Sequence, residues 1–154
     1  LVKEGREREF KDFDDKQESP DPSSPESFQK SMLSWRITED SEKQAMFNFY
    51  KEIIHLRKSH EILKETNKDN LEISNSDGVF KMERWKNDRK LICYMNYNSH
   101  KSSVQVSFSW KGNMKKVLDS SEKKWGGQGS TTSSKISTGE MLELPGRSII
   151  IYSN

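Results

Sequence analysis

The side chains best suited to acid–base, nucleophilic or metal chemistry are few in this sequence, and their spacing does not bring them together. His55 and His60 are five positions apart. This spacing places them on different faces of a helix, so we do not expect them to share a metal ion. His100 is the third histidine, and the chain has no Gly-x-Ser-x-Gly, Walker or Gly-x-Gly-x-x-Gly motif. We therefore expect no catalytic residue, no metal site and no cofactor in this chain.

Two short segments are similar to ligand-binding motifs but lack essential residues. Asp12, Asp14 and Asp15 form an acidic cluster without the glycine and the distal glutamate of a calcium loop. We interpret it as a solvated run of charge. Residues 125–129 (WGGQG) are rich in glycine, but no Lys-Ser/Thr pair and no helical pattern follow them, as a phosphate-binding loop requires. We interpret this segment as a flexible loop that one aromatic side chain fixes.

A basic stretch and three tryptophans leave two binding functions open. Residues 81–116 carry nine basic side chains against two acidic ones, a pattern that can mark a nucleic-acid surface. The whole chain is nearly balanced, with a formal net charge of +2, so we favour a solvated β face and expect no nucleic-acid partner. Trp85, Trp110 and Trp125 could stack on sugar rings or bases, although half-buried strand aromatics are more frequent.

Length and composition exclude several classes of protein. The chain of 154 residues is shorter than the roughly 250 residues of a complete (β/α)₈ barrel. With Cys93 as its one cysteine it cannot form an intrachain disulfide, so we expect a reducing, cytoplasmic location. No stretch approaches the roughly 18 apolar residues of a membrane span, and we expect no membrane partner. The first residue is Leu1 rather than Met, which indicates a piece of a larger protein. Composition does not indicate an oligomeric state.

The first 42 residues are polar, and one short helix is expected among them. Half of residues 1–30 are charged, so this segment alone cannot bury enough surface to offset its ordering entropy. Ser24 followed by Pro25 is typical of a helix N-cap and first helical position. This pair predicts a helix over residues 25–33.

The strongest helical pattern covers residues 43–59. Ser41 and Gln44 have the spacing of a capping box, in which each side chain bonds the other residue's backbone N–H. Arg57 and Lys58 suit the negative end of the helix dipole. Apolar side chains recur at helical spacing along one wide stripe: Met46, Phe47, Phe49, Tyr50, Ile53, Ile54 and Leu56. A stripe of this width predicts that the helix belongs to a core and packs on a large surface.

From residue 71 onward the apolar period changes to two, which predicts strands. Asp77-Gly78 lies between two such runs and predicts a tight hairpin turn. Residues 91–97 are apolar on both faces, as in a central strand, whereas residues 104–110 alternate as a half-buried strand does. The seven expected strands cover residues 71–74, 79–86, 91–97, 104–110, 116–118, 141–144 and 148–152. Short strands with turn signals between them predict a small antiparallel sandwich.

Two parts of the chain resemble one family of carbohydrate-active enzymes. Residues 5–10 (GREREF), 20–22 (PDP) and 27–35 (SFQKSMLSW) are similar to a stretch near the end of the barrel of malto-oligosyltrehalose trehalohydrolases. These enzymes belong to the α-amylase superfamily of glycoside hydrolases. Residues 50–60 resemble the last barrel helix, a pattern that many members of the superfamily share. The first block is the part most specific to the trehalohydrolases.

The β region resembles the same superfamily. Residues 117–129 (VLDSSEKKWGGQG) are similar to a loop of the C-terminal β domain in bacterial members. Residues 144–152 (LPGRSIIIY) are similar to its closing strand. The resemblance implies an α+β fragment: a polar segment and an amphipathic helix from the end of a (β/α)₈ barrel, then an antiparallel β-sandwich C-terminal domain. The implied boundary separates residues 1–66, the end of the barrel, from residues 67–154, the β domain.

The resemblance also implies an activity for the parent protein. Family members release trehalose by hydrolysing the α-1,4 bond next to a terminal trehalose unit. They use carboxylates at the ends of barrel strands in a retaining mechanism, and none of those motifs occurs in this chain. The chain alone is therefore expected to be inactive, and malto-oligosyltrehalose or maltodextrin to be the substrate of the parent. Arg6, Arg8 and Trp35 match family positions and are the candidate substrate-binding residues.

Three other interpretations stay open. The chain could come from a sister enzyme of the superfamily, such as a glycogen branching or debranching enzyme. It could instead be a non-catalytic carbohydrate-binding β module that uses tryptophans as stacking platforms. A single-strand nucleic-acid binder would need exposed aromatic side chains inside the basic stretch.

Overall fold

A computed structural model describes residues 4–5, 21–109 and 112–154 of the chain. The chain divides into two compact units, residues 1–37 and residues 38–154. No helix in the described ranges is both long enough and apolar enough to cross a membrane.

The first unit contains one described helix of more than one turn, α2 (Pro25–Ser31). The Ser24 side chain accepts a hydrogen bond from the backbone N–H of Glu26 at 3.1 Å, and Pro25 occupies the first turn. These contacts confirm the helix start predicted from Ser24-Pro25. The helix ends two residues earlier than predicted, because Met32 is in extended conformation. None of its residues is buried, which agrees with the polar composition.

The second unit begins with a long helix, α3 (Ser41–Ser59). Its N-cap is Asp40, whose carboxylate accepts hydrogen bonds from the backbone N–H groups of Glu42 at 3.0 Å and Lys43 at 3.2 Å. The predicted capping box with Ser41 as N-cap is therefore wrong, because the preceding aspartate already satisfies the free N–H groups of the first turn. The short 3₁₀ helices are η1 (Ile37–Glu39), η2 (Glu61–Lys64), η3 (Lys68–Asn70) and η4 (Lys123–Trp125).

The apolar stripe of α3 is largely uncovered. Leu56 is the one buried residue of this helix, and four apolar side chains are each more than half exposed: Met46, Phe47, Tyr50 and Ile54. The stripe is therefore not part of the β-domain core in the described chain, and its burial against a larger surface stays a prediction. The physical reason is that α3 has its main contacts with η2 and η4 rather than with the face of a sheet.

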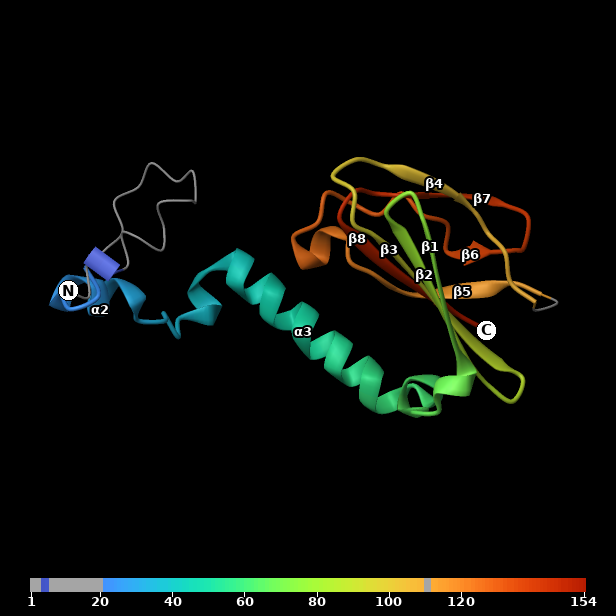
Figure 1. The fold of residues 1–154 in the computed structure, drawn as a ribbon, viewed down its shortest axis with the longest axis horizontal. Coiled ribbons are helices and arrows are strands. Elements are labelled where there is room, and N and C mark those ends of the chain that lie inside the picture. The colour runs from blue at the N-terminus through green and yellow to red at the C-terminus, as the bar shows by residue number, and fades with distance from the viewer. Residues whose placement is uncertain (1–3, 6–20, 110–111) are drawn as a thin grey trace. The chain divides into compact units, whose positions relative to one another are not determined.

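Within the described residues, eight strands form two antiparallel sheets, whose arrangement can be followed in Figure 1. They are β1 (Leu71–Ser76), β2 (Val79–Lys86), β3 (Arg89–Asn96), β4 (Ser102–Gln105), β5 (Met114–Asp119), β6 (Lys135–Ile136), β7 (Met141–Leu144) and β8 (Ser148–Ser153). Six of them form one sheet in the order β1-β2-β3-β8-β5-β6, and β4 pairs with β7 as a separate layer. This arrangement confirms the predicted antiparallel β domain.

The largest differences from the predicted strands concern β6 and β4. The two-residue strand β6 has no alternating pattern of its own and exists through its pairing with β5. The predicted strand over residues 104–110 ends at Gln105. Phe108 is nevertheless buried, and its backbone N–H and C=O both bond the Thr138 hydroxyl, at 3.0 and 2.9 Å. A side chain thus replaces the strand partner that the alternation predicted.

The main core lies between the two sheets. Successive side chains of a strand point to opposite faces, and β3 is buried on both, as expected for a central strand. Its inner face joins the main core, whose buried members are Val79, Ile92, Tyr94, Val106, Phe108, Met114, Ile136, Leu142, Leu144, Ile150 and Tyr152. Its outer face joins a smaller cluster of Ile62, Leu91 and Cys93, which attaches η2 to the sheet.

Candidate functional site

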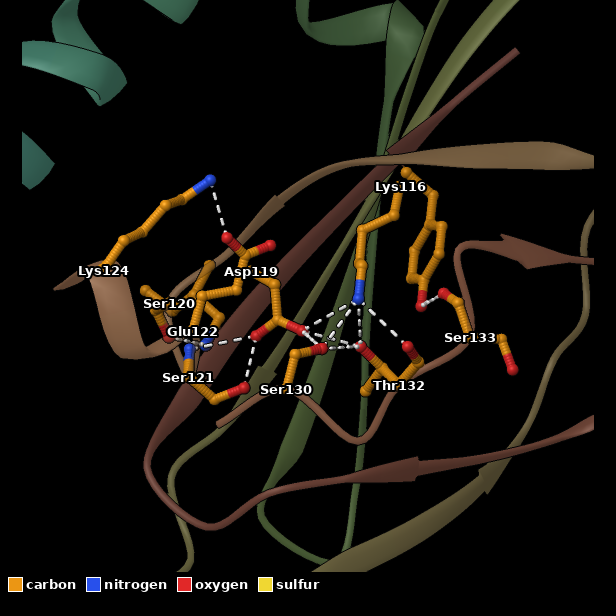
Figure 2. Close-up of polar contacts among 11 residues, drawn as sticks. Lys116, Asp119, Ser120, Ser121, Glu122, Lys124, Ser130, Thr132 and Ser133 are labelled. Atoms are coloured by element: carbon orange, nitrogen blue, oxygen red, sulfur yellow. Dashed lines mark hydrogen bonds and ion pairs between the residues drawn. The ribbon is translucent and has the colours of Figure 1, made fainter. Parts of the chain in front are cut away.

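Asp119, the last residue of β5, is fully buried and accepts hydrogen bonds on both carboxylate oxygens (Figure 2). Its Oδ1 accepts from the backbone N–H of Ser121 at 2.9 Å and from the Ser121 hydroxyl at 2.5 Å. Its Oδ2 accepts from the hydroxyls of Ser130 at 2.5 Å and Thr132 at 2.7 Å. The Lys116 ammonium lies 3.2 Å from the same oxygen. Together these five residues are called the Asp119 cluster.

The hydrogen bonds of the Asp119 cluster stabilise the ionised carboxylate. Burial alone would raise the pKa of Asp119, but the donors on Ser121, Ser130 and Thr132 outweigh it and lower the pKa to about 2. Lys116 donates in addition to the Ser130 hydroxyl at 2.7 Å, and to the Thr132 carbonyl and hydroxyl, both at 3.0 Å. Each side-chain donor of the cluster thus has an acceptor inside it.

This geometry indicates a structural role rather than catalysis. A general base needs a free lone pair within reach of a substrate proton, and the Asp119 carboxylate is buried with five donors around it. The cluster joins the end of β5 to the segment 120–132. Among the described residues, no group of three or more His, Cys, Asp or Glu side chains is placed to hold a metal ion.

Glycines allow the segment after Asp119 to fold tightly over the cluster. The backbone N–H of Gly129 bonds the Ser121 carbonyl at 2.8 Å, and that of Gly127 bonds the Glu122 carbonyl at 3.2 Å. A Cβ atom on Gly127 would collide with the backbone of Ser121. Trp125 contacts Phe49 of α3 edge to face, with ring centroids 5.6 Å apart. One aromatic does fix this loop, as predicted, but backbone hydrogen bonds organise it as well.

Replacing Gly127 with Ala is expected to lower the free energy of unfolding by about 3 kcal/mol, because the new methyl group displaces the Ser121 backbone. The matched control is Gly126→Ala in the same loop. A Cβ at Gly126 meets no atom, and its positive φ of 81° makes the expected cost about 1 kcal/mol. Urea denaturation of both variants measures the difference. Equal destabilisation would contradict the close approach.

Of the residues that sequence analysis selected for binding, the structure describes Trp35, Trp85 and Trp125. Trp35 is 84% exposed and lies in the first unit. Arg6, Arg8 and the three aspartates at positions 12, 14 and 15 lie outside the described residues, as does Trp110. Trp85 and Trp125 are both half-buried, and each has a lysine ammonium near its ring, Lys90 at 5.8 Å and Lys124 at 4.7 Å. Neither presents a free flat platform.

Of the three histidines, His60 makes a long-range contact. His55 and His100 are exposed. The His60 Nε2 atom lies 3.1 Å from the Ser153 hydroxyl, which donates in turn to the Lys90 carbonyl at 2.9 Å. His60 Nε2–H must therefore be the donor to Ser153, which leaves Nδ1 as a bare acceptor. Nδ1 is buried and has no partner among the described residues. The contact ties the end of α3 to β8 through a neutral imidazole.

Acidification is expected to weaken this contact. Burial lowers the pKa of His60, the Arg89 charge lowers it further, and Glu61 partly opposes both. Below the ordinary value of 6.5 the unfolded chain takes up a proton that the folded chain does not, so stability falls as the pH falls. Denaturation measured at about pH 7.5 and about pH 5.5 should show a smaller loss of folding stability on acidification in His60→Gln than in the unchanged chain. An equal effect in both proteins would contradict the neutral buried imidazole.

Sequence analysis missed the Asp119 cluster as a whole. An aspartate two residues before a serine is typical of a local Asx turn, and this spacing of Asp119 and Ser121 is visible in the sequence. The contributions of Lys116, Ser130 and Thr132 have no comparable signal, because they depend on how the segment 120–132 folds back.

Comparisons with known proteins identify the fold. The family described as the α-amylase C-terminal all-β domain matches residues 72–154. No curated protein sequence matches the chain. A putative α-amylase from Salmonella typhimurium is 23% identical with a TM-score of 0.64, covering 99% of this chain and 23% of that one. An α-amylase from H. orenii is 18% identical with a TM-score of 0.58, covering 86% of this chain and 25% of that one. The trehalulose synthase MutB from Pseudomonas mesoacidophila MX-45 is 15% identical with a TM-score of 0.54, covering 77% of this chain and 19% of that one.

These likenesses to solved structures concern the fold alone. The chain spans about a quarter or less of the length of each of these proteins. The family match covers more than half of the chain and includes all eight strands, apart from the first residue of β1. The chain therefore belongs to the α-amylase C-terminal all-β domain family.

Proposed function

We propose that the chain is the C-terminal part of a malto-oligosyltrehalose trehalohydrolase, a retaining glycoside hydrolase that releases trehalose from malto-oligosyltrehalose. The observation that carries this proposal is the resemblance of residues 27–35 to a trehalohydrolase segment, in a chain whose residues 72–154 belong to the α-amylase C-terminal domain family. We further propose a boundary between residues 1–66, from the barrel, and residues 67–154. A cytoplasmic location fits the single, buried Cys93.

Exposed apolar surface on the second unit supports a larger parent protein. Four apolar side chains of α3 are more than half exposed, as described above. On the outer face of the large sheet, Ile73 is 59% and Tyr97 is 68% exposed, and Ile149 adds to this face. Monomeric soluble proteins seldom leave several such patches open. A catalytic barrel in the parent would cover them.

The buried carboxylates of the described residues have structural partners. Retaining hydrolases need two carboxyl groups roughly 5–5.5 Å apart, one of them as nucleophile. Of the two buried carboxylates of the described β domain, Asp119 is occupied by its own donors, and Glu83 pairs with the Lys81 ammonium at 2.6 Å. In our proposal the catalytic carboxylates belong to the barrel, and this chain supports the barrel wall. Arg6, Arg8 and Trp35 stay candidates for substrate contact in the assembled enzyme.

The isolated 154-residue chain is expected to hydrolyse neither malto-oligosyltrehalose nor maltodextrin, because it lacks the catalytic carboxylates. Incubation of the purified chain with each substrate, followed by chromatography of the products, measures this. The control is the same preparation with an added amylase inhibitor, which suppresses any amylase carried over from the expression host. Steady release of trehalose by the pure chain would overturn the assignment.

The parent protein distinguishes the proposed reaction from its alternatives. With maltotriosyltrehalose it is expected to release free trehalose. A branching enzyme would change the chain pattern of an α-glucan without this product, and a debranching enzyme would release linear chains from a branched glucan. Either result would exclude the trehalohydrolase proposal while leaving the domain family unchanged. Absence of any activity, with sugar binding by the β domain, would favour a non-catalytic binding module.

A further inference from the structure

The strand β1 lies at the edge of the six-stranded sheet and pairs on one side only, with β2. It is the longest edge strand in the described ranges, since β4 and β7 have four residues each and β6 has two. Proteins protect edge strands by shortening them or by placing lysine or proline on them. The other edge strand of this sheet, β6, is short and contains Lys135, whereas β1 contains no lysine, arginine or proline. We propose that β1 pairs with β1 of a second copy of the chain, as an antiparallel two-fold dimer.

The turn between β1 and β2 decides which backbone groups of β1 face the open edge. Residues 77–78 form a two-residue turn with positive φ at both positions, so the pair that closes it, Ser76 and Val79, is hydrogen-bonded. Hydrogen-bonded pairs alternate along an antiparallel ladder. The N–H and C=O groups of Ile73 and Asn75 therefore point away from β2. Within the described part of the chain, these groups have no hydrogen-bond partner beyond β2.

Ile73, near the centre of β1, adds an apolar contact to the open edge. Its side chain is 59% exposed and lies directly opposite Met82 of β2. The two side chains therefore share the outer face of the sheet, where Met82 packs on the smaller apolar cluster. A strand added at this edge places its own side chain beside Ile73, and an apolar residue at that position continues the row.

Charge and hydrogen bonding select one register for the second copy. A two-fold axis at Glu72 would place two carboxylates opposite each other, which is unfavourable. An axis at Ser74 would place Ile73 opposite the Asn75 amide and lose the apolar contact. With the axis at Ile73, the two Ile73 residues exchange N–H···O=C bonds, and each Asn75 N–H meets the Leu71 carbonyl of the other copy. Glu72 then lies opposite the neutral Ser74.

This self-complementarity is the reason for assigning a second copy to the edge. In the register centred on Ile73, each exposed donor meets an acceptor, the apolar residue meets its own copy, and the single charge of the strand, Glu72, meets no like charge. The pairing extends the sheet within its own plane. It leaves the outer face available to the barrel of the parent, so the dimer goes beyond the proposed function and does not depend on it.

Analytical ultracentrifugation of the full 154-residue chain tests the proposal. We expect a reversible monomer–dimer equilibrium with a dissociation constant on the order of 100 µM, as for a small interface. Ile73→Lys places like charges opposite each other and should weaken the dimer at least about tenfold. An equimolar mixture of Ile73→Lys and Ile73→Glu should restore it, because opposite charges then meet at the two-fold axis.

The matched control is Met141→Lys. Met141 is 65% exposed and begins β7, an edge strand of the other sheet. Its replacement introduces the same charge at an exposed apolar position away from β1. This variant should dimerise as the unchanged chain does.

Amide hydrogen exchange provides a measurement that needs no substitution. The amides of Ile73 and Asn75 should exchange rapidly in dilute solution and gain protection as the protein concentration rises. The Ser74 amide faces β2 and should be protected at every concentration. Three results would overturn the proposal: a monomer at concentrations up to about 1 mM, a dimer that Ile73→Lys leaves unchanged, or no dimer in the mixture of the two charged variants.

Discussion

Asp119→Ala is expected to lower the free energy of unfolding of the β domain by about 4 kcal/mol, because removing one partner of a buried ion pair leaves the other charge uncompensated. Lys116 is 14% exposed in its side chain and would remain beside hydroxyl groups that have lost their acceptor. The Ser121 backbone N–H would lose its bond as well. Urea denaturation followed by circular dichroism measures the effect.

Two controls separate charge from packing at this position. Asp119→Asn retains the shape and one acceptor oxygen, so its cost should be smaller. The double variant Asp119→Ala with Lys116→Met removes the uncompensated charge and should recover part of the loss, which a double-mutant cycle quantifies. If the double variant is as unstable as the sum of the two single variants, the ion pair makes no coupled contribution.

The dependence of folding stability on acidic pH gives a further measurement of the Asp119 carboxylate. Its pKa is about 2 in the folded chain against an ordinary value of 3.8. A depressed carboxyl pKa gives stability that is present above 3.8 and lost as the pH falls through about 2. The difference corresponds to about 2 kcal/mol. Asp119→Asn should lose this part of the acid dependence.

Phe108→Asp is expected to unfold the β domain, because it places a charge inside the main core. Phe108 is 9% exposed and packs with the strands of both sheets. An unpaired buried carboxylate costs several kcal/mol, which is comparable with the whole stability of a typical domain, roughly 5–15 kcal/mol. Loss of the cooperative thermal transition and of dispersed NMR signals would show it.

Phe49→Asp is the matched control for this prediction. Phe49 is half-buried on α3 and contacts Trp125, so its replacement should leave the β domain folded at a cost of about 1–2 kcal/mol. It should change solubility or oligomeric state more strongly, since it makes an exposed apolar face polar. Size-exclusion chromatography measures this change. If Phe49→Asp unfolds the chain as Phe108→Asp does, α3 is part of the β-domain core.

The elements of the fold could largely be predicted from local patterns. The alternation of Val79–Lys86 and the double-sided apolar pattern of β3 predicted their strands, and Asp77-Gly78 predicted the turn between β1 and β2. The strand at 104–110 was predicted too long, because alternation cannot reveal that Thr138 replaces a strand partner at Phe108.

For α3 the period of apolar residues predicted a helix but not what would cover it. Helical spacing is a property of neighbouring residues, whereas burial depends on which distant surface is present. In this chain α3 contacts mainly η2 and η4. The N-cap was misplaced by one residue for a similar reason, because Asp40 and Ser41 are both suitable caps and the backbone conformation selects between them.

The sequence by itself determined the class of the protein: its helices, most of its strands, and motifs that resemble the α-amylase superfamily. Only the tertiary structure decided which polar groups meet. Asp119 contacts Ser130 and Thr132 across a folded-back loop, and His60 contacts Ser153. These contacts join segments that are far apart in sequence, so packing and strand pairing bring them together while no local pattern of residues encodes them.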